Sequence, residues 1–243
     1  MWRVPRLEVD QLSKSFGGVA AVRELSMSLD EGQILGLIGP NGAGKTTAFN
    51  LIAGFERPDR GAVRFGGRDI TGKAPHRISQ LGITRTFQTS KPFPHLTAIE
   101  NVMIGALAHG ADLPAARRVA EDALAQVGLS ARGPDRASDL PVEGQRMLEL
   151  ARALATRPKL LLLDEVMGGL TIGEIDRVMD RLRDVRRQGI AIIIVEHVMR
   201  AIMKISDRVV VMNFGEKIAE GTPADITADP RVHAAYLGRS RHA

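Results

Sequence analysis

A glycine-rich loop after a short apolar run constrains the fold of this chain more than any other feature. Residues 33–38, Gln-Ile-Leu-Gly-Leu-Ile, are nearly all apolar, as expected of a parallel strand that is buried on both faces. The loop at 39–47 reads Gly-Pro-Asn-Gly-Ala-Gly-Lys-Thr-Thr, and a helical pattern follows as far as Ala53. Strand, loop and helix in this order form one half of a β-α-β unit, which predicts an α/β fold.

The composition of this loop suits phosphate groups. Glycines let backbone N–H groups curl around an anion, and the start of the following helix adds positive potential. Lys45 would bring an ammonium to the β- and γ-phosphates, and the Thr46 hydroxyl would bind Mg²⁺. A simple strand-to-helix turn is the alternative, but the spacing of the motif favours nucleotide binding. The predicted binding residues are Gly39, Pro40, Asn41, Gly42, Ala43, Gly44, Lys45, Thr46 and Thr47.

A second candidate site lies where another apolar strand ends in two carboxylates. Residues 160–163 are leucines, and Asp164 and Glu165 follow them. Open α/β sheets bind ligands at the carboxyl ends of their strands. Asp164 would hold Mg²⁺ there, directly or through water, and Glu165 would orient and deprotonate an attacking water. A solvated acidic strand end is the alternative, which the nearby phosphate loop makes less favoured.

Composition narrows the class of protein. The 243 residues carry a net charge of +5, with 44% hydrophobic and 25% charged residues, as in a globular chain. The absence of cysteine excludes a disulfide framework and a Cys nucleophile, and 4% aromatic residues argue against stacking platforms for single-stranded nucleic acid. The start lacks the apolar run of a signal peptide, and the longest apolar runs are too short to span a bilayer. We therefore expect a cytoplasmic protein whose membrane role would need a partner.

The α/β pattern is interrupted by a central helical stretch. Periodicity predicts helices at 98–107, 113–127 and 144–155, with no good strand between about 91 and 155. Outside this stretch, helices are expected at 172–188 and 198–205. The expected strands are 7–12, 25–29, 33–38, 61–65, 83–86, 160–163, 190–195, 208–213 and 217–220, the last two as a hairpin.

Taken together, these motifs resemble the ATP-binding subunit of an ATP-binding cassette (ABC) transporter, and the resemblance covers nearly all of the chain. It implies an α/β fold: a P-loop ATPase core with a mostly parallel sheet, an N-terminal antiparallel β subdomain and an inserted helical subdomain. A single ABC-type domain would span 1–243, with the ATPase core at 1–90 and 156–243 and the helical subdomain at 91–155. ATP and Mg²⁺ are the implied ligands.

The resemblance assigns roles to residues that would carry little weight alone. Gln88 would contact Mg²⁺ and the attacking water and link hydrolysis to the membrane partner. His197 would stabilise charge on the transferred γ-phosphate, beside the catalytic Lys45 and Glu165. Phe16 would stack on adenine with Val22 packing nearby, although Phe16 is equally well explained as a core residue. The alternative for Gln88 is an ordinary surface glutamine, and the alternative for His197 is a structural histidine.

One motif departs from the family pattern. Many members carry Leu-Ser-Gly-Gly-Gln at the start of the helix that contacts the ATP of the opposite subunit, whereas residues 140–146 here read Leu-Pro-Val-Glu-Gly-Gln-Arg. Proline removes a hydroxyl and an N–H donor, and the glutamate adds negative charge where a phosphate would approach. We expect a competent but weakened trans contact. The residues assigned to it are Pro141, Val142, Glu143, Gly144 and Gln145. Val166 and Thr171 also replace usual residues in a loop expected to face the other subunit.

The stretches 85–88, 93–102 and 229–238 resemble the branch that serves branched-chain amino acid importers. Importers of urea, short amides or aromatic acids share much of this sequence and are the alternative. The resemblance implies transmembrane permease subunits, a second ATP-binding subunit, identical or related, and an indirect link to a periplasmic or extracellular solute-binding protein. It places the chain on the cytoplasmic face of the cell membrane.

The cluster at 91–101, with Phe93 and Leu96, is expected to form a groove for a short helix of the membrane subunit, the alternative being ordinary subdomain core. Two other classes of function compete with transport. A nucleic-acid-associated ABC ATPase would need a coiled coil, a second cassette or a continuous basic face, and we expect no nucleic-acid partner. An inactive regulatory cassette is suggested by the altered 140–146 stretch.

Overall fold

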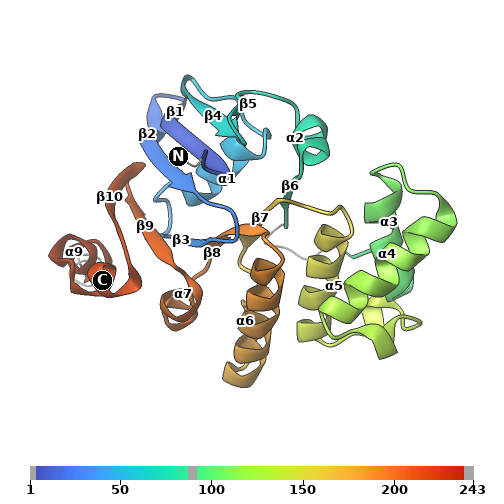
Figure 1. The fold of residues 1–243 in the computed structure, drawn as a ribbon. Helices are drawn as coiled ribbons and strands as arrows, with labels where there is room; N and C mark the ends of the chain where they lie inside the picture. The colour runs from blue at the N-terminus through green and yellow to red at the C-terminus, as the bar shows by residue number, and fades with distance from the viewer. Residues whose placement is uncertain (1–3, 87–91, 238–243) are drawn as a thin grey trace.

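The computed structural model describes residues 4–86 and 92–237. Two sheets form its centre (Figure 1). The antiparallel sheet has the order β2-β1-β4-β5, with β1 at Leu7–Phe16, β2 at Val19–Leu29, β4 at Arg60–Phe65 and β5 at Arg68–Asp69. The second sheet has the order β10-β9-β3-β8-β7-β6 and is parallel except for the β9–β10 hairpin. Its strands are β3 (Ile34–Ile38), β6 (Ile83–Arg85), β7 (Leu160–Asp164), β8 (Ala191–Val195), β9 (Arg208–Asn213) and β10 (Glu216–Gly221).

The parallel sheet is buried on both faces, as its continuous apolar runs predicted. Successive side chains of β7 and β8 point to opposite faces. Leu160 and Ile193 pack with the antiparallel sheet and the helix after the glycine loop, whereas Leu161 and Ile194 pack with helices on the other side. Figure 1 shows α6 and α7 on that second face. The two packed faces fix the strand ends, where the candidate site residues lie.

The helices of the core connect the strands. α1 (Lys45–Ile52) follows the glycine loop, and α6 (Ile172–Arg187) and α7 (Met199–Ile205) pack against each other. Thr171, which replaces the residue usual for the family, caps α6: its hydroxyl accepts from the Glu174 N–H, and the Glu174 carboxylate accepts from the Thr171 N–H at 2.7 Å. Such reciprocal capping stabilises a helix start. The remaining core helices are α2 (Pro75–Leu81), α8 (Pro223–Ala228) and α9 (Pro230–Leu237).

Three further helices pack on one another beside the core: α3 (Ala98–Leu107), α4 (Leu113–Gln126) and α5 (Val142–Leu154). They lie together at the right of Figure 1. Buried alanines, among them Ala106, Ala116 and Ala120, let α3 and α4 approach closely. Short 3₁₀ turns at Ser130–Arg132 and Ala137–Asp139 connect α4 to α5. The boundaries 91–155 of a helical subdomain stay a prediction.

Most expected elements are present with ends shifted by at most two residues, but the first two strands are longer than expected. The sequence interpretation missed β5, α2, α8 and α9, all short and weakly patterned. No helix within 4–86 and 92–237 is long and apolar enough to be a membrane span.

Candidate active site

The glycine loop connects β3 to α1 and is shaped by its neighbours. A Cβ at Gly39 would lie 2.1 Å from the carbonyl oxygen of Met212, and one at Gly44 would lie 2.2 Å from that of Ala21. Gly44 also has a φ of 100°, a left-handed value that side chains disfavour. These two glycines are therefore required by the close approach of β9 and β2, and they let the loop turn tightly into the start of α1.

Lys45 is buried at the start of α1, with an exposed fraction of 7%. Its Nζ donates to the carbonyl oxygens of Gly39 at 2.7 Å and Pro40 at 3.0 Å. These bonds bend the side chain back along the loop and place its charge at the carbonyl oxygens where the loop begins. In this position the Lys45 ammonium could bind the same phosphate group as the loop.

A single cleft of about 410 Å³ brings together most of the predicted glycine loop with Glu165 and His197. It is lined by residues 41–47 of the loop, by Glu165 and His197, and by Ala21 and Val195. Glu165 and His197 follow β7 and β8, which are neighbours in the parallel sheet, so both side chains reach the same edge as the loop after β3. Gly39, Pro40 and Asp164 are not among the lining residues.

Glu165 and His197 contact each other directly. A hydrogen bond of 2.7 Å joins Nε2 of His197 to Oε1 of Glu165. The glutamate has a φ of 53°, and its own N–H donates to the carbonyl oxygen of Val195 at 2.9 Å. A non-glycine residue in this region is strained, and such strain concentrates at functional sites. The bend turns the carboxylate toward the imidazole and the cleft.

Asp164 is 4% exposed and already has a cationic partner. Arg85, from the adjacent strand β6, donates from Nη2 to Oδ2 of Asp164 at 2.9 Å, and its other terminal nitrogen contacts the Asn50 side chain. The two charged side chains are 7% and 5% exposed. The hydroxyl of Thr86 accepts from the Asp164 N–H at 3.2 Å. In the sequence, Arg85 stood out only as part of a family-like stretch, because the short strand Ile83-Thr84-Arg85 gives no sign that its arginine is buried and paired.

The predicted adenine-binding residues Phe16 and Val22 also lie outside the lining of this cleft. Phe16 ends β1 with 44% of its surface exposed, and Nζ of Lys14 lies 5.3 Å from its ring centre. Val22 is 1% exposed and packs in the core. Phe16 therefore exposes part of its ring beside Lys14, and Val22 can act only as support beneath a ligand. Gln88 lies outside the described residues, so its role stays a prediction.

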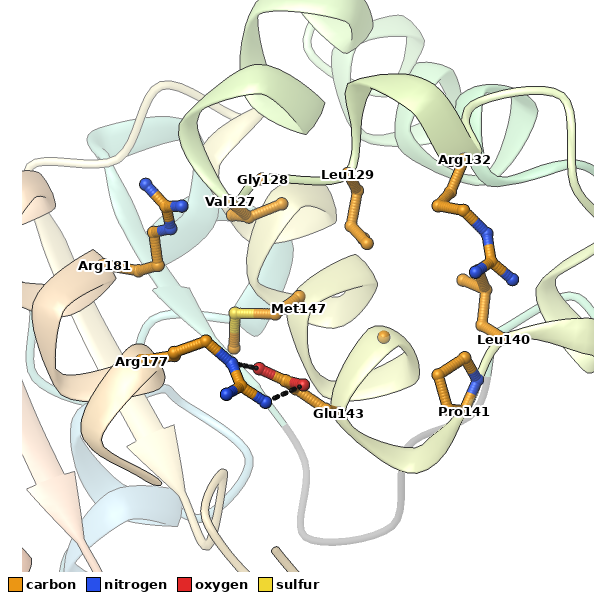
Figure 2. A pocket seen from close by; sticks show the side chains of 11 residues that line it. Val127, Gly128, Leu129, Arg132, Leu140, Pro141, Glu143, Met147, Arg177 and Arg181 are labelled. Carbon is orange, nitrogen blue, oxygen red and sulfur yellow. Dashed lines mark hydrogen bonds and ion pairs between the residues drawn. The ribbon is translucent and has the colours of Figure 1, made fainter. Parts of the chain in front are cut away.

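At the start of α5, Glu143 does not present a bare charge. Its two carboxylate oxygens accept from Nε and Nη2 of Arg177 on α6, both at 2.8 Å (Figure 2). Pro141 is the N-cap residue, and Val142 is 54% exposed. The Gln145 amide donates to the Leu140 carbonyl oxygen at 2.9 Å, so this side chain is turned back on its own loop.

A pocket of about 260 Å³ lies beside the Glu143–Arg177 pair. Its lining includes Gly144 and two further arginines, Arg132 and Arg181 (Figure 2). The added negative charge that the sequence predicted at the start of α5 is therefore compensated by a cation 34 residues away.

The apolar cluster near 91–101 contains an exposed aromatic ring held by a buried amide. Phe93 is 45% exposed, and its backbone N–H and C=O bond the Asn101 side chain at 2.8 and 3.0 Å. Asn101 is fully buried on α3, and the guanidinium of Arg152 lies 5.2 Å from the Phe93 ring centre. The expected groove is compatible with this placement and stays a prediction. Sequence reasoning missed Asn101, because a polar residue on a helix face gives no local sign of burial.

Comparison with known families gives two matches. A model described as "ABC transporter" matches residues 22–168, and one described as "Branched-chain amino acid ATP-binding cassette transporter" matches residues 216–242.

Curated relatives match over nearly the full length. The high-affinity branched-chain amino acid transport ATP-binding protein BraF of Pseudomonas aeruginosa is 38% identical, over 97% of this chain and 99% of the relative. The corresponding protein LivG of Salmonella typhimurium is 38% identical over the same shares. A probable LivG of Archaeoglobus fulgidus is 36% identical over 96% of this chain and 95% of its own.

Solved structures agree in fold. The ADP conformation of an ATP-binding cassette of an ABC transporter superposes with a TM-score of 0.89 at 31% identity, covering 97% of this chain and all of that one. A nucleotide-free ATP-binding cassette gives 0.88 at the same identity and coverage. The expected fold class, with its mostly parallel core sheet, antiparallel sheet and helices, is confirmed.

Proposed function

The chain belongs to the ABC transporter family as an ATP-binding, ATP-hydrolysing subunit, and from this premise we propose that it powers the uptake of branched-chain amino acids. The relatives whose names include branched-chain amino acid transport match over nearly their full length. The C-terminal family match names the same class of solute. An importer of urea, amides or aromatic acids is the alternative. The solute itself would contact other subunits, so residues of this chain record it only indirectly.

The residues present fit a nucleotide with Mg²⁺. Residues 41–47, Thr46 among them, line the cleft, and the Lys45 ammonium is held there by the carbonyl oxygens of Gly39 and Pro40. Thr46 and Gln88 are proposed to bind Mg²⁺, with Asp164, which pairs with Arg85 outside the cleft lining, in support. Within the described ranges no group of three or more His, Asp or Glu side chains would hold a metal alone, so phosphate oxygens would complete the coordination. When bound, Mg²⁺ would supply positive charge that neutralises the phosphates.

In the proposed mechanism, the chain's own residues position and activate water. The Glu165 carboxylate takes a proton from the attacking water, and Nε2 of His197 orients that carboxylate through their 2.7 Å hydrogen bond. As charge develops on the transferred phosphoryl group, Lys45 and His197 stabilise it. His197 is half exposed, so its ring can turn between the glutamate and a phosphate. Phe16 would stack on the adenine, with Val22 behind it.

Subunit partners follow from the family. Two ATP-binding subunits would each hold an ATP between their glycine loop and residues 140–146 of the other, with Pro141, Val142, Glu143, Gly144 and Gln145 at the contact. Residues 1–90 and 156–243 would act as the ATPase core and 91–155 as a helical subdomain. Phe93 and Leu96 would receive a helix of a transmembrane permease, on the cytoplasmic face of the membrane. A solute-binding protein would act through that permease, and no nucleic acid is involved.

The observation that carries this proposal is the single cleft shared by residues 41–47, Glu165 and His197. It is tested by measuring ATP binding and ATP hydrolysis of the purified chain, alone and with its co-purifying membrane subunits. Glu165→Gln should bind ATP as the wild type does and hydrolyse it at least about 1000-fold more slowly, because the base is lost. Glu174→Gln, on the capped start of α6, is the matched control and should hydrolyse normally.

Full turnover by Glu165→Gln would remove that residue from the base role. No hydrolysis by the wild type even with its membrane subunits would favour an inactive regulatory cassette, and salt-sensitive DNA or RNA binding would favour the nucleic-acid class. The solute is tested by uptake into vesicles that carry the complex. Leucine should be taken up in an ATP-dependent manner, and uptake of urea, amides or aromatic acids instead would contradict the branched-chain assignment.

A further inference from the structure

Glu196 is a buried carboxyl group that the mechanism above does not use. It directly follows β8 and precedes His197, and only 3% of its surface is exposed. Acidic side chains are seldom buried to this extent unless they are paired or hydrogen-bonded. A glutamate in this place therefore needs a specific partner.

The partner is the backbone of the loop that follows Glu165. The N–H of Met167 donates to Oε1 of Glu196 at 2.6 Å, and Met167 is itself fully buried. Two residues earlier, the N–H of Glu165 donates to the carbonyl oxygen of Val195 at 2.9 Å. The end of β8 thus binds the chain on both sides of Val166, at Glu165 through its backbone and at Met167 through the Glu196 side chain.

These two bonds enclose the strained bend. Glu165 has a φ of 53°, a value that a non-glycine residue keeps only when its surroundings hold it. The Val195 bond belongs to the end of the sheet, but the Met167 bond depends on one side chain. The Met167 N–H is therefore linked to the end of β8 through the Glu196 side chain.

We propose that Glu196 is a positioning residue for ATP hydrolysis, whose buried carboxyl group anchors the Met167 amide and thereby holds Glu165 against His197. The inference rests on the proposed role of Glu165 as the base. A small displacement of a catalytic group is enough to slow a reaction by one to two orders of magnitude. Glu196 would thus act on the rate of the chemical step and not on ATP binding, because it does not line the cleft.

The surroundings of Glu196 are consistent with a role as a hydrogen-bond acceptor that does not depend on its charge. Burial raises its pKa to about 7, and the nearby Glu165 adds to this, whereas the amides of Met167 and His197 and the charge of Arg146 on α5 oppose it. Near neutral pH the carboxyl group is therefore present in both protonation states, and either one can accept from an N–H. A neutral side chain of the same shape should serve in its place.

Two substitutions of Glu196 form a matched pair. Glu196→Gln keeps an acceptor oxygen in the same position, and Glu196→Met has a similar size but no acceptor. We expect Glu196→Met to lower kcat for ATP by about 10- to 100-fold, with KM and the ATP dissociation constant within about twofold of the wild type. Glu196→Gln should keep kcat within about threefold, since the hydrogen bond survives.

Several results would overturn the inference. These are an unchanged kcat in Glu196→Met, an equal loss of kcat in both variants, or a loss of ATP affinity that accounts for the slower turnover. If Glu196→Met does not fold, hydrogen exchange of the wild-type protein decides. The Met167 amide should then exchange as slowly as those of β7, and rapid exchange would contradict the anchor.

The failure of this inference can be separated from that of the proposed function. If Glu165→Gln is inactive and Glu196→Met is fully active, Glu165 remains the base and only the anchor is wrong. If Glu165→Gln turns over normally, the proposed mechanism is wrong whatever Glu196 does.

Discussion

The nucleotide cleft and the start of α5 differ in how their chemistry is specified. In the cleft, the backbone of 41–47 and residues at strand ends supply the groups, and close contacts such as the one at Gly44 leave no room for other side chains. At α5, Pro141 and Glu143 replace the residues usual for the family, and Arg177 on another helix offsets the added charge. A site built from backbone tolerates little change in sequence, whereas a site of exposed side chains can be rebalanced from a distance. The predictions below test this contrast.

The largest effect is expected in the cleft, from Lys45→Ala. The buried ammonium is held by carbonyl oxygens of the loop, and its removal would take away the proposed charge-assisted contact to phosphate. ATP affinity, measured by isothermal titration, should fall by about 100-fold or more. Lys73→Ala, at an exposed lysine after β5, should leave it unchanged. A decrease of less than about threefold would break the assignment of the cleft.

The next largest effect, on the free energy of unfolding, is expected at the buried Arg85–Asp164 ion pair beside the cleft. Arg85→Met removes the cation that pairs with Asp164 and leaves a buried charge uncompensated. The free energy of unfolding, from urea titration, should fall by about 3 kcal/mol. The control Arg183→Met removes a partly exposed ion pair with Asp180 and should cost less than about 1 kcal/mol. Equal losses in both variants would show that Arg85 is not a buried support.

A pH-dependent effect is expected from Glu196. Its pKa is raised from 4.5 to about 7 in the folded protein, so between these values the folded state binds more protons than the unfolded state. Stability from this group is therefore present below pH 4.5 and is lost as the pH rises through 7. Glutamine does not titrate, so the stability of Glu196→Gln relative to the wild type should rise by about 2 kcal/mol between pH 5 and pH 8. A constant difference across this range in urea titrations would contradict the raised pKa.

The smallest effects are expected at α5, where the side chains are more exposed. Arg177→Ala should weaken ATP-driven self-association by about threefold, because in the proposed dimer the uncompensated Glu143 charge would lie near the partner's phosphates. Adding Glu143→Gly to Arg177→Ala should restore self-association. The double variant Pro141→Ser, Glu143→Gly should associate more tightly than the wild type. Sedimentation with ATP in a Glu165→Gln background measures each of these. Independent, additive effects of Arg177 and Glu143 would show that the ion pair does not rebalance this surface.

Much of the core was predictable because local pattern and tertiary structure agree there. The apolar strands β3, β7 and β8 are short runs between clear breaks, and parallel strands bring their ends to one edge. The expectation that the loop and Glu165 share a site follows from that rule alone. The short elements α2, α8 and α9 escaped notice because six to eight residues carry little periodicity.

The side-chain pairs around the site could not be predicted in the same way. The partners Arg85 with Asp164, Arg177 with Glu143 and Glu196 with Met167 are separated by 79, 34 and 29 residues. Nothing in the local sequence says that such groups meet, because the packing of β6, α6 and β8 decides it. Only the unusual residue types, such as a glutamate at the end of an all-apolar strand, gave a signal that was available in advance.

The central claim is that residues 39–47, Glu165 and His197 form one site for ATP. A crystal structure of Glu165→Gln with ATP and Mg²⁺ tests it most directly. We predict the triphosphate within the loop, with Nζ of Lys45 on the phosphates in place of the carbonyl oxygens of Gly39 and Pro40. A cleft that stays empty at millimolar nucleotide, or a nucleotide bound elsewhere, would contradict the account.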